Sequence, residues 1–251
     1  MSTEQLLRGK TAIVTGAARN LGRGIARMLA QEGANVVVHY ATDRSRDDAA
    51  ETARLISAIG AGVDLVRADF SDPSSASTLV ESCLARFGSL DILINNAGMI
   101  VKKPVAEITD EEFDRIFAIN AKAPFILMRE AARRMRDGGR IVNVGTSILA
   151  CSFPSYSVYA GSKAPLEHFT RALAKELATR RIAVNTIAPG ALETPFFYSA
   201  ESEESASQIK HFTGGLGAVE DVVPLVRFLV QPDAAWVSGQ TIFVNGAFVT
   251  R

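Results

Sequence analysis

Short runs of valine, isoleucine and leucine alternate with amphipathic stretches along almost the whole chain, and this alternation limits the possible folds more than any other feature. The apolar runs fall at residues 11–15, 35–40, 63–68, 92–95, 140–145, 182–187 and 241–245. The amphipathic stretches fall at residues 21–32, 46–59, 76–87, 110–135, 158–178 and 219–230. Near-continuous apolar strands are typical of a parallel sheet covered on both faces. The alternation therefore predicts an α/β fold with one doubly wound parallel sheet of about seven strands and helices on both faces.

No linker, repeat or low-complexity segment divides the 251 residues, which are enough to bury one substantial core. We therefore expect residues 1–251 to form a single domain. The least patterned stretch is residues 191–216, which follows a strand and carries the aromatic cluster Phe196-Phe197-Tyr198. Long segments at the carboxyl end of a strand are often functional, so this stretch predicts a loop or lid over a substrate pocket.

Bulk composition excludes several classes of function. Lysine plus arginine equals aspartate plus glutamate at 27 each, so no global positive charge would attract nucleic acid or anionic lipid. No apolar run approaches the roughly 20 residues that a membrane span needs, and the first ten residues lack a signal-peptide core. The two cysteines, Cys83 and Cys151, and the three histidines show no metal-ligand spacing, so we expect no metal site, no disulfide and a cytoplasmic location.

A glycine-rich turn joins the first strand to the first helix, over residues 15–24 (TGAARNLGRG). Glycines at such a turn let the backbone approach a pyrophosphate, whose charge suits the start of the following helix. The strict G-x-G-x-x-G spacing is absent, because the glycines are Gly16, Gly22 and Gly24. The turn favours dinucleotide binding over a tight connection without a ligand.

Tyr159 and Lys163 stand four residues apart in a helical pattern, so they share one helix face. A free phenol has a pKa of about 10, and a nearby cation favours the phenolate and lowers that value. A tyrosine tuned in this way can give a proton to a carbonyl oxygen or take one from an alcohol. The pair alone could equally be a helix-surface contact.

With these motifs together, the chain resembles the short-chain dehydrogenase/reductase family over nearly its whole length. It is similar to that family's 3-oxoacyl-carrier-protein reductases and carbonyl reductases. Thr15, Gly16 and Gly22 match the family's glycine turn, and Asn20 takes the place of its middle glycine; asparagine tolerates positive φ better than most residues. Residues 95–98 (NNAG) match a second family motif, and residues 189–194 a third, P-G-x3-T. The resemblance implies a single dinucleotide-binding and catalytic domain of the Rossmann type over residues 1–251.

The cofactor implied by the resemblance is NADP(H), favoured over NAD(H). The end of the second strand, where an acidic residue would bind the ribose hydroxyls of NAD, is Tyr40. Arg19 and Arg44 could instead pair with a 2′-phosphate, unless they are ordinary surface charges. The predicted cofactor-binding residues are Gly16, Arg19, Asn20, Leu21, Gly22, Tyr40, Arg44, Asp69, Phe70, Asn96, Ala97, Gly98, Tyr159, Lys163, Pro189, Gly190, Leu192 and Thr194.

By the same resemblance, Tyr159 is the proton donor or acceptor, and Lys163 lowers its pKa and binds the nicotinamide ribose. The family places a serine thirteen residues before the tyrosine. That spacing favours Thr146, whereas the residue type favours Ser147, so both remain candidates. Asn120 matches the fourth catalytic residue, whose carbonyl holds a water in the family. Pro124 lacks the N–H that would otherwise bond that carbonyl.

The predicted function is NADP(H)-dependent hydride transfer between the nicotinamide and a carbonyl or alcohol substrate, in the direction of ketone reduction. An NAD-dependent alcohol or sugar dehydrogenase and a non-catalytic dinucleotide-sensing regulator are the alternatives. We expect a small-molecule substrate that tolerates apolar walls made by Cys151, Phe153, Pro154, Phe196, Phe197 and Tyr198. The resemblance also implies a homotetramer or homodimer built on the helices at residues 110–135 and 158–178.

Overall fold

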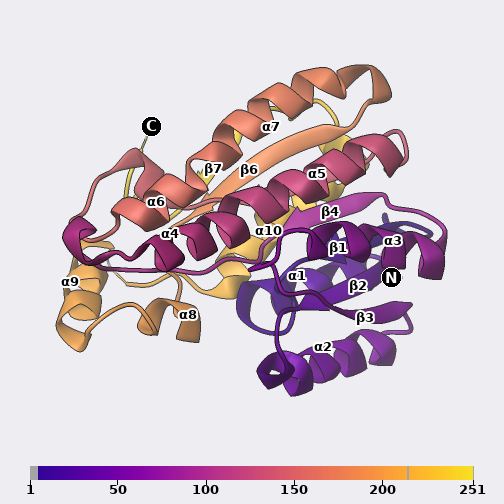
Figure 1. Cartoon of the computed structure of the whole chain (residues 1–251). Helices are drawn as coiled ribbons and strands as arrows, with labels where there is room; N and C mark the ends of the chain where they lie inside the picture. The colour runs from indigo at the N-terminus through magenta and orange to yellow at the C-terminus, as the bar shows by residue number, and fades with distance from the viewer. Residues whose placement is uncertain (1–4, 214, 251) are drawn as a thin grey trace.

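The computed structural model describes residues 5–213 and 215–250, and these form a seven-stranded parallel sheet between two layers of helices (Figure 1). All seven predicted strands are confirmed; the structure has β1 (Thr11–Val14), β2 (Asn35–Tyr40), β3 (Val63–Arg67), β4 (Ile92–Asn95), β5 (Arg140–Val144), β6 (Ala183–Pro189) and β7 (Thr241–Val244). Their order in the sheet is β3-β2-β1-β4-β5-β6-β7. The chain therefore reverses direction across the sheet between β1 and β4, where doubly wound folds bind ligands. Residues 1–4, 214 and 251 of the predicted domain and lid lie outside the described residues.

Alternate residues on each strand pack against opposite helix layers. Ala12 and Val14 belong to one buried cluster, whereas Ile13 between them belongs to the other. The first layer contains α1 (Asn20–Gln31), α2 (Arg46–Ala58) and α10 (Val219–Val230). The second contains α3 (Ser75–Phe87), α5 (Ala123–Arg134) and α7 (Pro165–Glu176). Both faces of the sheet are thus covered, which explains why its strands are apolar without alternation.

The helix predicted over residues 110–135 is broken into three parts in the structure: α4 (Asp110–Phe117), a π-helical turn (Ala118–Lys122) and α5. Pro124 has no N–H for the carbonyl four residues earlier, so the regular pattern cannot continue through it. The Ala123 N–H bonds instead to the Ala118 carbonyl, five residues back. Such wide turns often mark functional sites, and this one carries Asn120.

The helix predicted over residues 158–178 is also divided, into α6 (Ser157–Lys163) and α7. Ala164 between them keeps helical dihedral angles, and Pro165 is the first residue of α7. Proline is well tolerated there, because the first helical N–H has no intrahelical partner. Tyr159 and Lys163 both lie on α6, before the break, so Pro165 leaves their relative position on the helix face intact.

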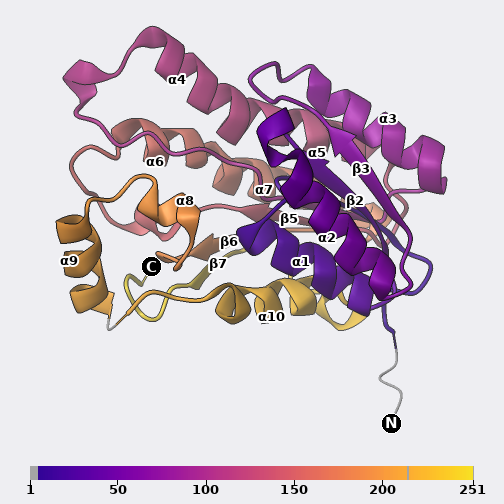
Figure 2. The same cartoon turned by 90° about the horizontal axis from the view of Figure 1, so that it is seen from below.

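Residues 191–216 hold two helices that the weak sequence pattern did not predict, α8 (Pro195–Tyr198) and α9 (Glu203–Thr213). Thr194 caps α8 with a side-chain oxygen that accepts the Phe197 N–H at 3.4 Å, and Pro195 opens the helix. Figures 1 and 2 both show α8 and α9 at one end of the sheet, beside α6. Within the described residues, no helix is both long enough and apolar enough to cross a membrane.

Candidate active site

A cavity of about 610 Å³ opens at the carboxyl ends of the strands and reaches from the turn after β1 to α8 and α9. The structure gathers seventeen of the eighteen predicted cofactor residues, all except Arg44, around this one cavity. Thr146 and Ser147 line it too. Arg44 is exposed outside the lining, and Asn120 is buried behind it.

The turn after β1 has the tight geometry that a pyrophosphate site needs. Asn20 has a φ of +51°, which confirms that it replaces a glycine in the left-handed region. A Cβ on Gly22 would lie 2.2 Å from the Gly16 carbonyl oxygen, so only glycine fits there. Arg19 precedes α1 without a side-chain hydrogen bond to the helix start. The first N–H groups of α1 are therefore suited to bind an anion.

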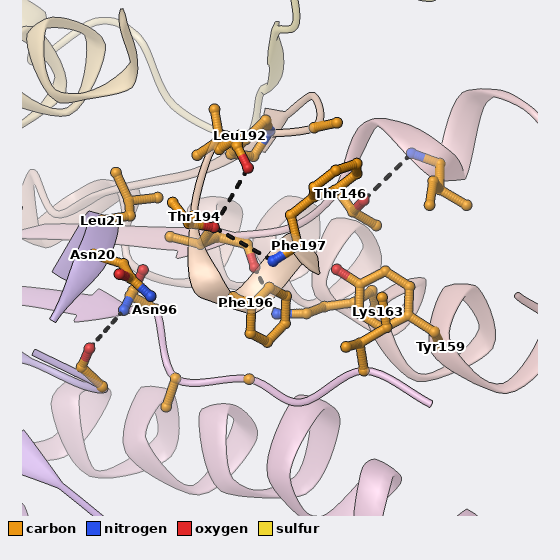
Figure 3. Close-up of a pocket in the computed structure, with 18 of the residues that line it drawn as sticks. Asn20, Leu21, Asn96, Thr146, Tyr159, Lys163, Leu192, Thr194, Phe196 and Phe197 are labelled. Carbon is orange, nitrogen blue, oxygen red and sulfur yellow. Dashed lines mark hydrogen bonds between the residues drawn. The ribbon is translucent and has the colours of Figure 1, made fainter. Parts of the chain in front are cut away.

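Short polar side chains hold this turn against the end of β4. The Thr15 hydroxyl accepts the N–H groups of Asn96 and Ala97, each at 2.9 Å. The Asn96 side-chain amide donates to the carbonyls of Thr15 at 2.9 Å and Gly16 at 3.2 Å (Figure 3). The NNAG motif and the glycine-rich turn are thus joined by hydrogen bonds between short side chains and backbone groups.

His39, at the end of β2, is a lining residue that sequence analysis missed. Its Nδ1 accepts the Gly16 N–H at 3.0 Å, so Nε2 carries the proton that it shares with the Ala68 carbonyl at 2.8 Å. The ring stacks on Phe70 with centroids 4.3 Å apart. Burial lowers the pKa of His39 to about 4, so the ring is neutral near pH 7. The sequence signal that could have identified His39 was a polar residue inside the otherwise apolar strand VVVHY.

Arg19 is the basic residue that the structure brings to the cavity near the end of β2. It lies in the lining with Tyr40, and also with Ala41 and Ser45, which were not predicted. Its guanidinium is 3.7 Å from the Asp48 carboxylate, and the side chain is 61% exposed. Asp48 also pairs with Arg23 at 3.4 Å. Arg19 is therefore held only by a weak, exposed ion pair.

The reactive end of the cavity brings Tyr159 to Thr146 rather than to Ser147. Figure 3 shows the phenol oxygen of Tyr159 pointing toward Thr146, whose hydroxyl is its hydrogen-bond partner. The Ser147 hydroxyl is used elsewhere: it donates to the Ala188 carbonyl at 2.8 Å and accepts from the Asn245 amide at 3.1 Å.

Burial raises the pKa of the Tyr159 phenol, and the hydrogen bond from Thr146 partly opposes that rise. The expectation that Lys163 would lower this pKa is therefore not met in this structure. Lys163 is buried as well; its Nζ donates to the Val144 carbonyl at 2.9 Å, and burial lowers its own pKa to about 8. Desolvation by burial is the main cause of both shifts. A Cβ on Gly98 would lie 3.1 Å from Nζ, so Gly98 makes room for the ammonium.

Asn120 is completely buried and supports the site from behind. Its side-chain oxygen accepts the Met99 N–H at 2.9 Å, and its amide donates to the Met99 carbonyl and the Ser162 hydroxyl, both at 2.9 Å. The side chain thus ties the segment after β4 to α6. These bonds occupy the side chain and leave the predicted function of Asn120 to its backbone carbonyl.

The expected apolar walls of the substrate pocket are present in part. Phe153, Pro154, Phe196 and Phe197 line it, whereas Cys151 and Tyr198 do not. Sequence analysis missed further lining residues because they belong to no motif: Ile100, Lys102, Ile148, Tyr156, Glu201, Ser205, Gln208, Ile209 and Phe248. Among the described residues, no group of three or more histidine, cysteine, aspartate or glutamate side chains is placed to hold a metal.

Known proteins match this chain over nearly its full length. A relative from Picea abies named short-chain type dehydrogenase/reductase is 41% identical, over 97% of this chain and 93% of the relative. The hydroxynaphthalene reductase-like protein Arp2 of Metarhizium brunneum is 37% identical, over 99% of this chain and 98% of that protein. The crystal structure of a putative dehydrogenase from Burkholderia cenocepacia with bound NADP has a TM-score of 0.95 and 41% identity, over 100% of this chain and 97% of that chain.

The fold and the lining of the cavity define the class of protein, an oxidoreductase built on a dinucleotide-binding sheet. A family model described as enoyl-(acyl carrier protein) reductase matches residues 16–248. The chain belongs to the short-chain dehydrogenase/reductase family.

Proposed function

We propose that this protein reduces a ketone to an alcohol with NADPH. The observation that carries the proposal is the buried Tyr159 phenol, which meets the Thr146 hydroxyl in the same cavity as the glycine-rich turn. Two comparisons support it: one similar structure holds NADP, and one relative is named for the reduction of hydroxynaphthalene.

The lining fits a dinucleotide phosphate. The turn through Gly16, Asn20 and Gly22 brings the start of α1 to the cavity, where its N–H groups would bind the pyrophosphate, and a Cβ on Gly22 would push this turn apart because it would lie 2.2 Å from the Gly16 carbonyl oxygen. All six residues Asp69, Phe70, Pro189, Gly190, Leu192 and Thr194 line the cavity, and in this proposal the first two would border the adenosine and the other four the nicotinamide. When bound, NADPH supplies the hydride for the carbonyl carbon.

Each catalytic side chain then has a proton to hold or move. Thr146 and Tyr159 donate hydrogen bonds to the substrate oxygen, and Tyr159 gives its proton to that oxygen as negative charge develops there. A phenol with a raised pKa is protonated at neutral pH, which suits a proton donor. Lys163, with a pKa of about 8, binds the ribose hydroxyls and returns a proton toward Tyr159. The Asn120 carbonyl holds the water that connects Lys163 to solvent.

NADP(H) would be preferred over NAD(H) because Arg19 lines the cavity together with Tyr40, where a 2′-phosphate would lie, and Tyr40 carries no negative charge to repel it. Arg19→Ala should weaken NADPH binding by about 10- to 100-fold, the usual value of a charge-assisted contact, and change NADH binding by less than about twofold. Fluorescence titration of both cofactors measures this. Equal losses for the two cofactors would remove Arg19 from phosphate recognition.

The proposal also covers the segment over the substrate, the assembly of the chain and its compartment. The described residues within 191–216 would cover a small-molecule substrate as a lid. Phe113 on α4 and Phe125 on α5 are 47% and 46% exposed, and covering these side chains at an interface would stabilise a homotetramer or homodimer. Cys83 and Cys151 are both free thiols, as suits a reducing cytoplasm. Light scattering of the purified protein tests the assembly.

The experiment that tests the reaction is oxidation of NADPH and NADH, side by side, with β-keto esters and thioesters, aryl ketones, quinones and keto sugars. Turnover with NADPH on one class is the expected result. Faster turnover with NADH on alcohols or keto sugars would favour the NAD-dependent dehydrogenase. Tight cofactor binding without turnover on any class, in either direction, would favour a dinucleotide-sensing regulator.

A further inference from the structure

Four polar side chains form a connected group at the end of the cavity away from the glycine-rich turn, and we name it the distal cluster: Lys102, Tyr156, Glu201 and Ser205. Lys102 Nζ lies 2.5 Å from Glu201 Oε2 and 3.1 Å from the Ser205 hydroxyl. Tyr156 donates its hydroxyl proton to Glu201 Oε1, and Ser205 donates to Oε2. Both carboxylate oxygens of Glu201 are therefore engaged.

The carboxylate of the distal cluster is almost closed to solvent, and the cluster carries balanced charge. The side chain of Glu201 is 1% exposed and that of Lys102 is 23% exposed. A buried carboxylate is strongly unfavourable unless a cation and hydrogen bonds compensate it, so Lys102 is the partner that allows Glu201 to lie here. Two of the three ammonium donors of Lys102 already point to Glu201 and Ser205. The pair presents little net charge to a molecule in the cavity.

The distal cluster lies close enough to the reactive phenol for one substrate to reach both. The rings of Tyr156 and Tyr159 are 6.2 Å apart, and Lys102 Nζ is 5.2 Å from the Tyr156 ring. One aromatic ring thus separates Tyr159 from the ion pair. A ketone held at Tyr159 would place the opposite end of a ring-sized body beside Lys102 and Glu201.

We infer that Glu201, by neutralising Lys102, makes this cavity select ketones that are uncharged at the end remote from the carbonyl. The inference rests on the proposed function and narrows its substrate class to neutral, apolar-bodied ketones rather than keto acids. A substrate carboxylate at this end would lose its water and face the Glu201 carboxylate, while Lys102 is already paired. Like charges brought together at a desolvated site are strongly disfavoured.

The test compares methyl 4-acetylbenzoate with 4-acetylbenzoate, two ligands of one shape that differ in charge, together with their 3-acetyl isomers. Calorimetry with NADP⁺ present measures binding without turnover. The wild-type protein should bind the ester at least about tenfold more tightly than the acid. Glu201→Gln keeps the size, and its amide oxygen can still accept from Lys102 and Ser205 while its NH2 group donates to the Tyr156 oxygen, but the Lys102 charge is left unpaired. Its ester-to-acid ratio should fall by about tenfold or more.

The double variant Glu201→Gln, Lys102→Gln is the matched control, because it removes the charge that should attract the acid. Its preference for the ester should return to the wild-type value. An equal ratio in the wild type and Glu201→Gln would overturn the inference, and so would failure of the wild type to bind either ligand. NADPH oxidation measured on the same ligands separates the two proposals. If the charge preference shifts as expected but no carbonyl compound is reduced, the inference holds for ligand binding and the proposed ketone reduction is wrong.

Discussion

The two halves of the cavity are built by different means. The cofactor half comprises the glycine-rich turn, the end of β2 and the NNAG segment, and backbone groups and short side chains hold it together. The substrate half comprises α8, α9 and the segment before α6, and long side chains such as those of the distal cluster join it to the body. Backbone contacts cannot adjust to a substitution, whereas side-chain contacts can be replaced. We therefore expect changes in the cofactor half to damage fold and binding together, and changes in the substrate half to alter preference alone.

The largest expected effect lies where the halves meet. Tyr159→Phe removes only the phenol oxygen, so kcat should fall by about 10²- to 10⁴-fold, the usual contribution of a general acid. NADPH affinity should stay within about twofold, because the ring and Lys163 remain. Stopped-flow turnover with fluorescence titration measures both.

Thr146→Val and Ser147→Ala give the matched pair for this prediction. Because the Ser147 hydroxyl is bonded to Ala188 and Asn245, its loss should reduce kcat far less than the loss of the Thr146 hydroxyl. A larger loss in Ser147→Ala would make Ser147 the catalytic hydroxyl. Retained turnover in Tyr159→Phe would remove Tyr159 from the mechanism.

The same division decides how much could be predicted from sequence. The seven strands follow from local apolar runs, and the left-handed Asn20 follows from its place in the turn. These features depend on residues close together in the chain. The choice of Thr146 over Ser147 needed the structure, because adjacent strand-end residues point in different directions and only the fold shows which one meets Tyr159.

Features that depend on distant partners were missed. The ion pair of the distal cluster joins Lys102 to Glu201, which are 99 residues apart, and neither lies in a motif. The sequence likewise gave no reason to link His39 to Gly16, or to expect α9 in a weakly patterned segment. The raised pKa of Tyr159 was missed for a related reason, because burial is a property of the whole fold.

Gly22→Ala tests the rigidity of the cofactor half. The new methyl group would meet the Gly16 carbonyl oxygen at 2.2 Å, a backbone atom that Asn96 holds in place. Overpacking of this kind costs about 1–3 kcal/mol of stability, and NADPH affinity should fall with it. Chemical denaturation and fluorescence titration measure the two effects.

Gly161→Ala is the control, because its methyl group would find Phe117 Cζ only at 3.9 Å, an ordinary contact. Alanine also favours a helix over glycine by about 1 kcal/mol, so this variant should be as stable as the wild type or more stable. Equal stability of both variants would show that the turn can adjust, and the contrast between the two halves would fail.

His39 should make the cofactor half sensitive to acid. Its pKa is lowered from 6.5 to about 4 in the folded protein. Between pH 6.5 and pH 4, His39 therefore binds a proton in the unfolded chain but stays neutral in the folded protein. The contribution of neutral His39 to the free energy of unfolding is therefore fully present above pH 6.5 and is lost as the pH falls toward 4. One such group gives a slope of at most about 1.4 kcal/mol per pH unit.

His39→Asn removes this titration, so its stability should depend less on pH between 6.5 and 4. Denaturation curves at several pH values compare the two proteins, and the difference at pH 7 serves as the reference for any loss of packing. An unchanged acid slope in the variant would show that other groups cause the acid sensitivity of the fold.

Phe196→Ala should have the smallest effect on the fold and confine its consequences to the substrate. Phe196 lies on α8 and is 39% exposed, so stability should change by no more than about 0.5 kcal/mol. The KM for an aryl ketone should rise about fivefold, which corresponds to roughly 1 kcal/mol of lost apolar contact.

Phe228→Ala is the control, since Phe228 on α10 is 43% exposed and lies outside the cavity lining. The stability of this variant should match that of Phe196→Ala, and its KM should equal the wild-type value. If Phe196→Ala instead destabilised the protein as much as Gly22→Ala, the lid would be part of the same rigid unit as the glycine-rich turn, because a half-exposed side chain has that effect only where its contacts hold the core together.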